Sequence, residues 1–161
     1  AGAMINSLIC SGIDTKEFAF LGFLPLNKKL RKKKLGEIEK SNKTIIIYEA
    51  PHKLETTLND LQKILGKERR ITLAREITKI HEEFIRGNID EILQKSENLK
   101  GEIVLIIEAN ENCEDENVLK NLTLEEHYKF YENQGFTKKD IIKKIAKDRN
   151  MNKNDVYQKF I

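Results

Sequence analysis

Two short apolar segments constrain the fold of this chain more than any other feature. Residues 44–48 read TIIIY and residues 102–108 read EIVLIIE, and both are of strand length and rich in β-branched residues. A strand that is apolar on both faces must be covered on both sides, which is typical of the inner strands of α/β proteins. The second segment is therefore predicted to lie at the centre of its sheet.

Helix and strand signals alternate around these two segments. Residues 18–23 (FAFLGF) predict a short buried strand that ends before Pro25, and residues 27–40 predict a basic helix weakened by Gly36. Pro51 suits the first position of a helix, where its missing N–H needs no partner. One face of that helix is predicted to carry four leucines, after which Gly66 ends it: Leu54, Leu58, Leu61 and Leu65.

Further along, the pattern predicts two more strands and a capped helix. Residues 70–77 form the first strand, with Ile71, Leu73 and Ile77 on one face, and residues 81–85 form the second. Asn88, with Glu91 three residues later, is typical of a capping box. Residues 1–110 therefore predict an α/β fold, a mixed sheet flanked by helices.

From residue 111 the pattern changes to helices alone. Residues 111–117 carry four acidic side chains and no basic one. Three helix-start signals follow, and they are Thr123 with Glu126, Thr137 with Asp140, and Asn152 with Asp155. We predict a small all-helical appendage over residues 118–161, with a boundary within 110–122 and helix-turn-helix spacing in its last two helices. His127 is expected on its surface.

Length and composition exclude several classes of protein. The 161 residues suffice for one domain or a domain with an appendage, and no window approaches 18 consecutive apolar residues, so no membrane association is expected. Cys10 and Cys113 are far apart and lack metal-ligand spacing, so we expect no metal and two reduced thiols in a cytoplasmic protein.

The net charge of +3 is unevenly distributed along the chain. Residues 27–43 carry eight Lys or Arg against two Glu, and residues 137–161 carry eight against three Asp. Two basic blocks of this kind favour a polyanionic partner, although a solvated lysine-rich face would have the same composition.

The segment Tyr48-Glu49-Ala50-Pro51-His52 is the most informative local feature. It joins the end of a buried strand to a helix N-terminus, and ligands of open α/β sheets gather beyond the carboxyl ends of strands. Glu49 and His52 could there orient a hydroxyl group or accept its proton. Alternatively, Glu49 caps the helix and His52 lies on its exposed first turn.

A second charged cluster occupies residues 74–87, AREITKIHEEFIRG. Arg75, Lys79 and Arg86 could hold phosphates, and Glu76, Glu82 and Glu83 could balance them or position a ligand. The alternative is an edge hairpin held by ion pairs. The HEE segment lacks the second histidine of a zinc-protease motif, and no glycine-rich phosphate loop occurs.

Taken in order, these segments resemble the rRNA small-subunit methyltransferase I family, which has the tetrapyrrole methylase fold. The resemblance rests on SGIDTKEFAFLGFLP, TIIIYEAPHKLETTLNDL and LAREITKIHEEFIRGNIDEI, and it runs from about residue 5 to residue 108. YEAPH followed by AREITK, HEE and RG makes the resemblance specific. The terminal helices are similar to the small C-terminal domain of the family.

The resemblance implies transfer of a methyl group from S-adenosylmethionine to the ribose 2′-oxygen of a cytidine in 16S rRNA of the small ribosomal subunit. It implies that Tyr48, Ala50 and Pro51, together with an Arg86-Gly87 turn, border the donor pocket, with Glu49 and His52 as candidate catalytic residues. The cations expected to contact RNA phosphates are Lys28, Lys29, Arg31, Lys32, Arg75 and Lys79, together with the terminal helices.

Family members begin with a further domain that carries glycine-rich loops, and the donor lies between the two domains. This chain corresponds to the part that follows, so we expect it to supply one wall of the cleft, to bind S-adenosylmethionine poorly and to be inactive alone. The resemblance also implies a homodimer.

Three other functions agree with parts of the sequence. A non-catalytic RNA-binding module would use the basic blocks and would not need YEAPH or HEE. A methylase of the same fold acting on a tetrapyrrole would need a more aromatic pocket than this chain, with 7% aromatic residues and no Trp, can build. A structural dimerisation domain would need none of the charged cluster.

Overall fold

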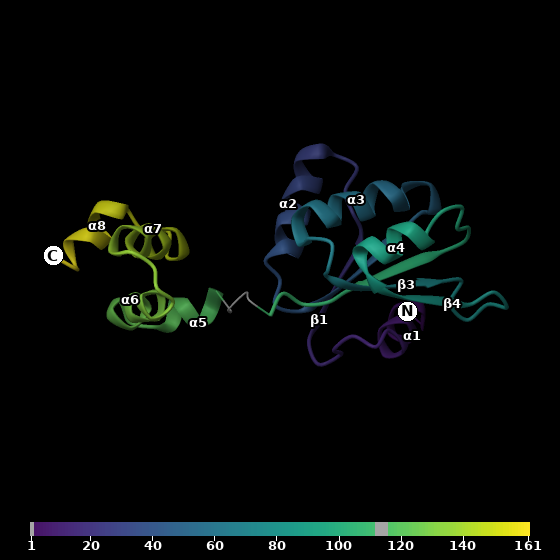
Figure 1. Ribbon diagram of the computed structural model, residues 1–161, viewed down its shortest axis with the longest axis horizontal. Helices are drawn as coiled ribbons and strands as arrows, with labels where there is room; N and C mark the ends of the chain where they lie inside the picture. The colour runs from purple at the N-terminus through teal and green to yellow at the C-terminus, as the bar shows by residue number, and fades with distance from the viewer. Residues whose placement is uncertain (1, 112–115) are drawn as a thin grey trace. The chain divides into compact units, whose positions relative to one another are not determined.

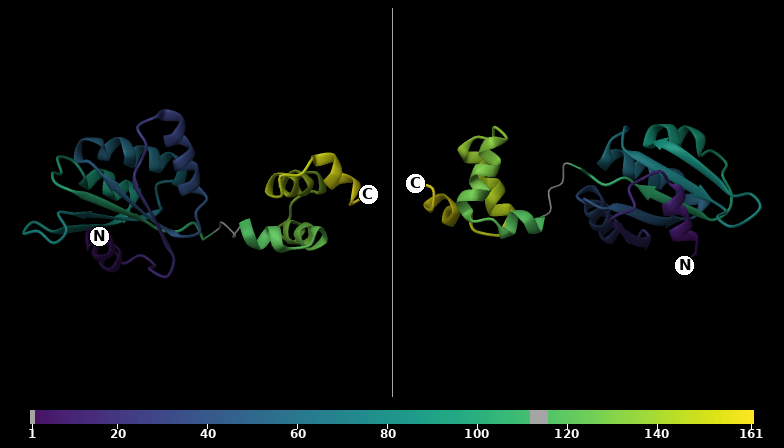
Figure 2. Two further views of the ribbon diagram at one scale, coloured as in Figure 1. Left: turned by 180° about the vertical axis from the view of Figure 1, so that it is seen from behind. Right: turned by 90° about the horizontal axis from the view of Figure 1, so that it is seen from below.

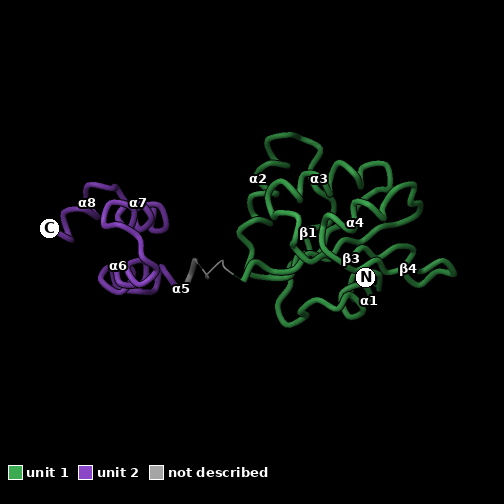
Figure 3. The backbone as a smooth tube through the Cα atoms, viewed as in Figure 1, with its two compact units in different colours: residues 1–113 green, residues 114–161 purple. Residues whose placement is uncertain are grey.

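The computed structural model describes residues 2–111 and 116–161. The chain divides into two compact units, residues 1–113 and 114–161 (Figure 3). Cys10 is an exposed free thiol, and Cys113 lies outside the described residues. No helix among the described residues is long and apolar enough to cross a membrane. That the first unit is a methyltransferase subdomain and the second a separate helical domain stays a prediction.

The first unit is built on a five-stranded mixed sheet. Its strands are β1 (Phe18–Phe23), β2 (Thr44–Glu49), β3 (Arg70–Arg75), β4 (Glu83–Asn88) and β5 (Ile103–Ile107). They lie in the order β1-β2-β5-β3-β4, so β5 is central, and all five of its residues are buried. The prediction of a mixed α/β sheet with this segment at its centre is confirmed.

Helices cover both faces of the sheet. Three of them, α2 (Lys28–Glu39), α3 (Leu54–Leu65) and α4 (Ile89–Lys95), lie on one face, and α1 (Gly2–Cys10) lies on the other (Figures 1 and 2). A single turn of 3-10 helix, Pro51–Lys53, leads into α3. Alternation along each strand divides the core: Ile45 and Ile47 pack toward α2–α4, and Ile46 packs toward α1.

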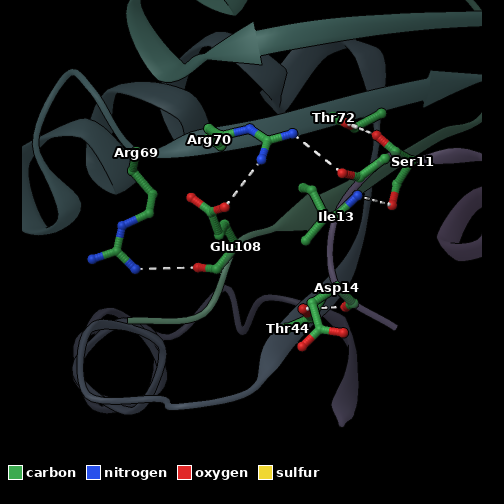
Figure 4. A network of polar contacts seen from close by, with 9 residues as sticks. Ser11, Ile13, Asp14, Thr44, Arg69, Arg70, Thr72 and Glu108 are labelled. Carbon is green, nitrogen blue, oxygen red and sulfur yellow. Dashed lines mark hydrogen bonds and ion pairs between the residues drawn. The ribbon is translucent and has the colours of Figure 1, made fainter. Parts of the chain in front are cut away.

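Side-chain hydrogen bonds tie the segment after α1 to the sheet (Figure 4). The Thr72 hydroxyl donates to the Ser11 carbonyl at 2.8 Å, and the Thr44 hydroxyl donates to the Asp14 carbonyl at 2.7 Å. Arg70 donates to the Gly12 carbonyl and pairs with Glu108 on the same side. Helix α1, which no sequence pattern predicted, is thereby held against β3 and β5.

Strand β1 differs from its prediction. It was expected to be buried, but it is an edge strand that pairs only with β2, and its side chains alternate between half-buried and exposed. Ala19 and Leu21 pack against the helix-covered core, whereas Phe18, Phe20 and Phe23 are 38%, 45% and 64% exposed. The run FAFLGF is apolar on both sides, yet the structure covers only one of them.

The other elements follow the predictions with shifted ends. The strand predicted for residues 70–77 ends at Arg75, because Glu76 and Thr78 adopt left-handed backbone conformations. The strand predicted for 81–85 is displaced to β4. The capping box at Asn88 and Glu91 is present, and Gly66 follows α3 as predicted.

The second unit consists of α5 (Glu116–Asn121), α6 (Leu124–Asn133), α7 (Lys138–Asp148) and α8 (Lys153–Gln158). Thr123, Thr137 and Asn152 cap the last three helices, as predicted. Its core contains Tyr131, Ile141, Ile142, Ile145, Ala146 and Val156.

His127 was expected on the surface of this unit, and that expectation is wrong. The side chain is 0% exposed, and its ring lies between two charged residues. Arg149 Nε donates to Nδ1 at 3.0 Å, and Nε2 lies 3.2 Å from Asp148 Oδ2. A buried imidazole with a partner on each nitrogen is part of the core.

Candidate functional site

Three strands end at the same edge of the sheet. Strands β1 and β2 are parallel, and β3 runs in the same direction because both β2 and β3 are antiparallel to β5. Their carboxyl ends border a cavity of about 660 Å³. It is lined by Ala3, Phe23, Tyr48, Glu49, Ala50, Pro51, Glu76, Ile77, Lys79, Gly101, Glu102, Ile103 and Val104.

One wall of this cavity is the end of β2 and the turn that follows it. Tyr48 is half-buried and packs with the residues on the α1 side of the sheet. Ala50 and Pro51 continue the wall. The backbone of Ala50 is extended, and Pro51 is the first residue of the 3-10 turn. All three residues predicted to border the donor pocket from this segment therefore line one cavity.

The Glu49 carboxylate is buried, with 5% of the residue exposed, and both of its oxygens accept hydrogen bonds. Oε2 accepts from the Thr57 hydroxyl of α3 at 2.6 Å, and Oε1 accepts from the Ala50 N–H at 2.8 Å. Arg31 of α2 donates to the same Thr57 oxygen at 3.0 Å and pairs with Asp60 at 3.0 Å. Glu49 thus joins the turn after β2 to the helix layer.

The opposite wall is the turn after β3. Glu76 and Thr78 have backbone φ angles of 53° and 67°, which are unusual for residues other than glycine. Glu76 Oε1 accepts from the Glu102 N–H at 2.7 Å and from Lys79 Nζ at 3.4 Å. These contacts hold the pKa of Glu76 below its ordinary value, the Glu102 N–H most strongly.

His52 is not brought to this cavity. It is exposed and lines a different hollow of about 750 Å³, formed by the start of α3 and the segment after α4. Glu49 lines the cavity of about 660 Å³ and His52 lines the hollow of about 750 Å³, while Pro51 lines both, and the catalytic role of the two residues stays a prediction.

Arg86 and Gly87 lie within β4 and not in a turn, which corrects the expectation for this pair. Neither residue lines the cavity of about 660 Å³. The Arg86 guanidinium donates to the Cys10 carbonyl at 2.6 Å and lies over the Phe84 ring at 5.1 Å, so it fastens the end of α1. A Cβ on Gly87 would lie 2.3 Å from Glu91 Oε2, so the glycine leaves room for the capping box of α4.

The six cations predicted to contact RNA fall into two groups. Lys28, Lys29 and Lys32 are exposed on α2. The other three are engaged within the protein: Arg31 pairs with Asp60, Arg75 with Glu83, and Lys79 with Glu76 and Glu102. The pair between Arg75 and Glu83 crosses from β3 to β4, which agrees with the alternative of an ion-paired edge hairpin.

Sequence reasoning missed several residues of the cavity. Phe23 and the segment 101–104 reach it from β1 and from the start of β5, and Ala3 reaches it from α1. The density of charge after β3 was a usable signal for Glu76, whereas the contribution of Ala3 depends on a helix that no pattern predicted. Among the described residues, no group of three or more His, Cys, Asp or Glu could hold a metal ion.

The fold and the site place the chain in a class. No protein-family model matches the sequence. The methyltransferase CobJ has a similar structure, with a TM-score of 0.54 at 16% identity over 66% of this chain and 47% of CobJ. At that identity the likeness shows the fold alone. The first unit therefore has a tetrapyrrole methylase-like α/β fold.

Sequence relatives specify the family. Ribosomal RNA small subunit methyltransferase I of Bacillus subtilis is 43% identical over 99% of this chain, and that of Halalkalibacterium halodurans is 42% identical over 98%. The chain is a homologue of the ribosomal RNA small subunit methyltransferase I family. It spans about half the length of these relatives, 56% and 55% respectively.

Proposed function

We propose that this chain forms one wall of the donor site in an S-adenosylmethionine-dependent methyltransferase that modifies the ribose 2′-hydroxyl of a cytidine in small-subunit rRNA. The main support is the cavity of about 660 Å³ between the YEAP turn and the turn after β3, in a homologue of the ribosomal RNA small subunit methyltransferase I family. Both segments are the ones that the family resemblance rests on.

The lining of the cavity suits such a donor. Ala50, Pro51, Ile77 and Val104 offer an apolar surface for an adenine ring, and Lys79 and the carboxylates of Glu76 and Glu102 lie at the same cavity for polar groups. The volume lies in the range of small-molecule sites, roughly 300–1,000 Å³. The bound sulfonium would supply an activated methyl group, so the protein contributes mainly alignment.

In this proposal Glu49 is a positioning residue. Its carboxylate is fully engaged by Thr57 and the Ala50 N–H, so it fixes the backbone of Ala50 at the wall of the cavity. His52 stays in the proposal as a candidate for contact with RNA at the neighbouring hollow, since it is exposed there.

Among the described residues, RNA contacts are assigned to exposed cations outside the ion pairs named above. Lys28, Lys29 and Lys32 on α2 qualify, and Lys139, Lys143 and Lys147 form an exposed row on α7 at intervals of four residues. Arg31 holds the helix layer together and is not part of this set. A homodimer, which the family resemblance implies, belongs to the proposal without an assigned surface, and sedimentation of the chain tests it.

The donor site can be tested on the 161-residue chain. Because the chain spans about half of its relatives, we expect calorimetry to detect no micromolar binding of S-adenosylmethionine. Weak binding at millimolar donor should still shift the amide resonances of Ala50, Ile77 and Gly101. Resonances of residues in β4, such as Arg86, serve as the internal control. Shifts confined to β4 or to the second unit would contradict the proposed site.

The activity can be tested in a chimaera in which this chain replaces the matching part of the Bacillus subtilis relative. We expect the chimaera to methylate small-subunit rRNA at a ribose. Glu49→Gln should lower the rate while leaving RNA affinity unchanged, and Lys32→Ala should weaken RNA binding. A folded chimaera that binds the donor but methylates no rRNA would contradict the proposed substrate.

A further inference from the structure

Three aromatic side chains form a cluster on the outer part of the sheet, which we call the aromatic platform: Phe20, Phe23 and Tyr48. The Phe20 and Tyr48 ring centroids are 4.9 Å apart, and those of Phe23 and Tyr48 are 5.8 Å apart, both edge to face. Phe20 is 45% exposed and Phe23 is 64% exposed. Rings that contact one another while facing solvent present a ready surface for another flat group.

An irregularity in β1 creates this platform. In the register with β2, Phe20 lies opposite Ile46 and Phe23 lies opposite Tyr48, so one extra residue is accommodated between them. Gly22, with φ of 66°, sits at this bulge. Strict alternation would place Phe20 and Phe23 on opposite faces, whereas the bulge places both on the Tyr48 face.

The platform is continuous with the cavity. Phe23 and Tyr48 line the cavity of about 660 Å³, and Phe20 extends the aromatic surface outward along β1. A molecule that reaches into the cavity from this side must therefore pass over the rings. Bulges that redirect a side chain next to a functional site are a recurrent feature of sheets.

Exposed cations follow β1 along the chain, on helix α2, which covers the opposite face of the sheet from the platform. Lys28, Lys29 and Lys32 are exposed on α2. Lys28 follows Phe23 by five residues and is at most about 18 Å away along an extended chain. Proteins hold single-stranded nucleic acid by stacking its bases on exposed aromatic rings, while cations elsewhere along the strand meet its phosphates.

We propose that the aromatic platform stacks an unpaired base of the RNA substrate at the mouth of the cavity. The inference rests on the proposed function and specifies how the RNA would enter the site. A ribose hydroxyl can approach a donor in the cavity only if its nucleotide leaves the helical stack, and the base then needs a new stacking partner. Phe23 and Tyr48, at the rim, are placed to provide it.

The experiment uses the 161-residue chain and a short single-stranded RNA that contains one 2-aminopurine, whose fluorescence falls when it stacks. We expect saturable quenching with the unmodified chain. Phe20→Leu and Phe23→Leu keep apolar bulk but remove the ring, and each should weaken binding by roughly 5- to 100-fold. Circular dichroism checks that both variants fold.

Phe18→Leu is the matched control. Phe18 belongs to the same strand and is 38% exposed, but it lies opposite Thr44 at the end of β1 far from the cavity. It should bind RNA like the unmodified chain. Lys29→Ala should reduce the salt dependence of binding while leaving the quenching amplitude unchanged, because phosphate contacts do not affect stacking.

Several outcomes would overturn the inference. They are binding and quenching by Phe23→Leu equal to the unmodified chain, equal losses in Phe18→Leu, or no RNA binding at all. Loss of self-association in Phe20→Leu with unchanged RNA affinity would assign the platform to a protein interface. The donor titration monitored at Ala50 is independent of RNA, so it reports failure of the proposed function separately. If added S-adenosylmethionine displaced the RNA and restored the 2-aminopurine fluorescence, the rings would belong to the donor site.

Discussion

Tyr48 and Glu49 are neighbours in sequence but belong to different environments. Both residues line the cavity, but Tyr48 packs on the α1 side of the sheet, whereas the Glu49 carboxylate accepts a hydrogen bond from Thr57 of α3 on the other side. This follows from strand geometry, since successive side chains point to opposite faces. The hydrogen bonds of Glu49 give this acidic residue a structural role, and its catalytic role stays a prediction.

The Thr57 hydroxyl gives the first prediction. It donates to Glu49 and accepts from Arg31, so Thr57→Val would leave a buried carboxylate without one of its two partners. We expect a loss of about 1–3 kcal/mol in the free energy of unfolding, measured by urea denaturation. Thr57→Ser retains the hydroxyl and should lose much less. A Thr57→Val variant as stable as the unmodified chain would contradict this role of the hydroxyl.

His127 makes the stability of the second unit depend on pH. Burial lowers its pKa, and nearby Arg149 lowers it further, against the opposing effect of Asp148. Arg149 can only donate, so Nδ1 must accept and the ring must be neutral, with its proton on Nε2 toward Asp148. Protonation would break the Arg149 contact.

The sign of the pH effect follows from linkage. The pKa of His127 is lower in the folded than in the unfolded state, so its stabilisation is complete above 6.5 and is lost as pH falls. We expect the second unit to be less stable at about pH 5.5 than at about pH 7.5, measured by hydrogen exchange of α6 and α7 amides. His127→Gln should remove this difference, and His52→Gln, at an exposed histidine, should not. A profile that is flat in the unmodified chain would contradict the proposed cause.

At the scale of elements, a capping box formed by Asn88 and Glu91 joins the end of β4 to the start of α4. The Asn88 side chain accepts from the Glu91 N–H, and the Glu91 carboxylate accepts from the Asn88 N–H, each at 2.9 Å. Gly87 leaves room for that carboxylate. The RG pair of the sequence thus has a structural explanation for its glycine.

Gly87→Ala should displace the Glu91 carboxylate and weaken the cap. We expect the free energy of unfolding of the first unit to fall by about 1 kcal/mol, the usual value of a helix cap. Gly36→Ala is the control, since Gly36 lies inside α2 with nothing within 4 Å of an added Cβ. It should stabilise the chain by about 0.5–1 kcal/mol. Stabilisation in both variants would exclude the proposed role of Gly87.

Local sequence patterns predicted most of the helices and strands, but they predicted less well which side chains are buried. Caps at Asn88 and Thr123 and the apolar run of β5 depend on residues close in sequence, so a pattern could identify them. The exposure of β1 and the burial of His127 depend on contacts with distant residues. No local pattern could predict them.

The candidate site shows the same division. The YEAP wall was predicted from a strand that runs into a proline-started helix, and the structure places it at the cavity. That Glu49 and His52 line different hollows depends on the register of β2 and on the 3-10 turn at Pro51–Lys53, which the sequence does not reveal. Arg86 lies in a strand because β4 continues to Asn88, three residues beyond the predicted end.

At the scale of the whole chain, the two units have separate cores. The described core of the first unit is formed by the sheet and α1–α4, and that of the second by α6, α7 and α8. Ile145, 0% exposed, belongs to the second core, and Leu105, also 0% exposed, belongs to the first.

Ile145→Ala should therefore destabilise one unit selectively. Removing a buried aliphatic side chain costs about 2–5 kcal/mol. We expect faster hydrogen exchange at α6, α7 and α8 amides and unchanged exchange at β5 amides. Leu105→Ala should show the reverse pattern. Faster exchange throughout the chain in either variant would mean that the units unfold together.

The central position of β5 has a consequence for synthesis on the ribosome. Among the described residues, Ile103–Ile107 is the last strand along the chain, yet it lies between β2 and β3. Until it emerges, the nascent chain holds two separate strand pairs, each with an open edge prone to mispairing. A premature stop before residue 103 would thus release a polypeptide without the strand that joins its two strand pairs.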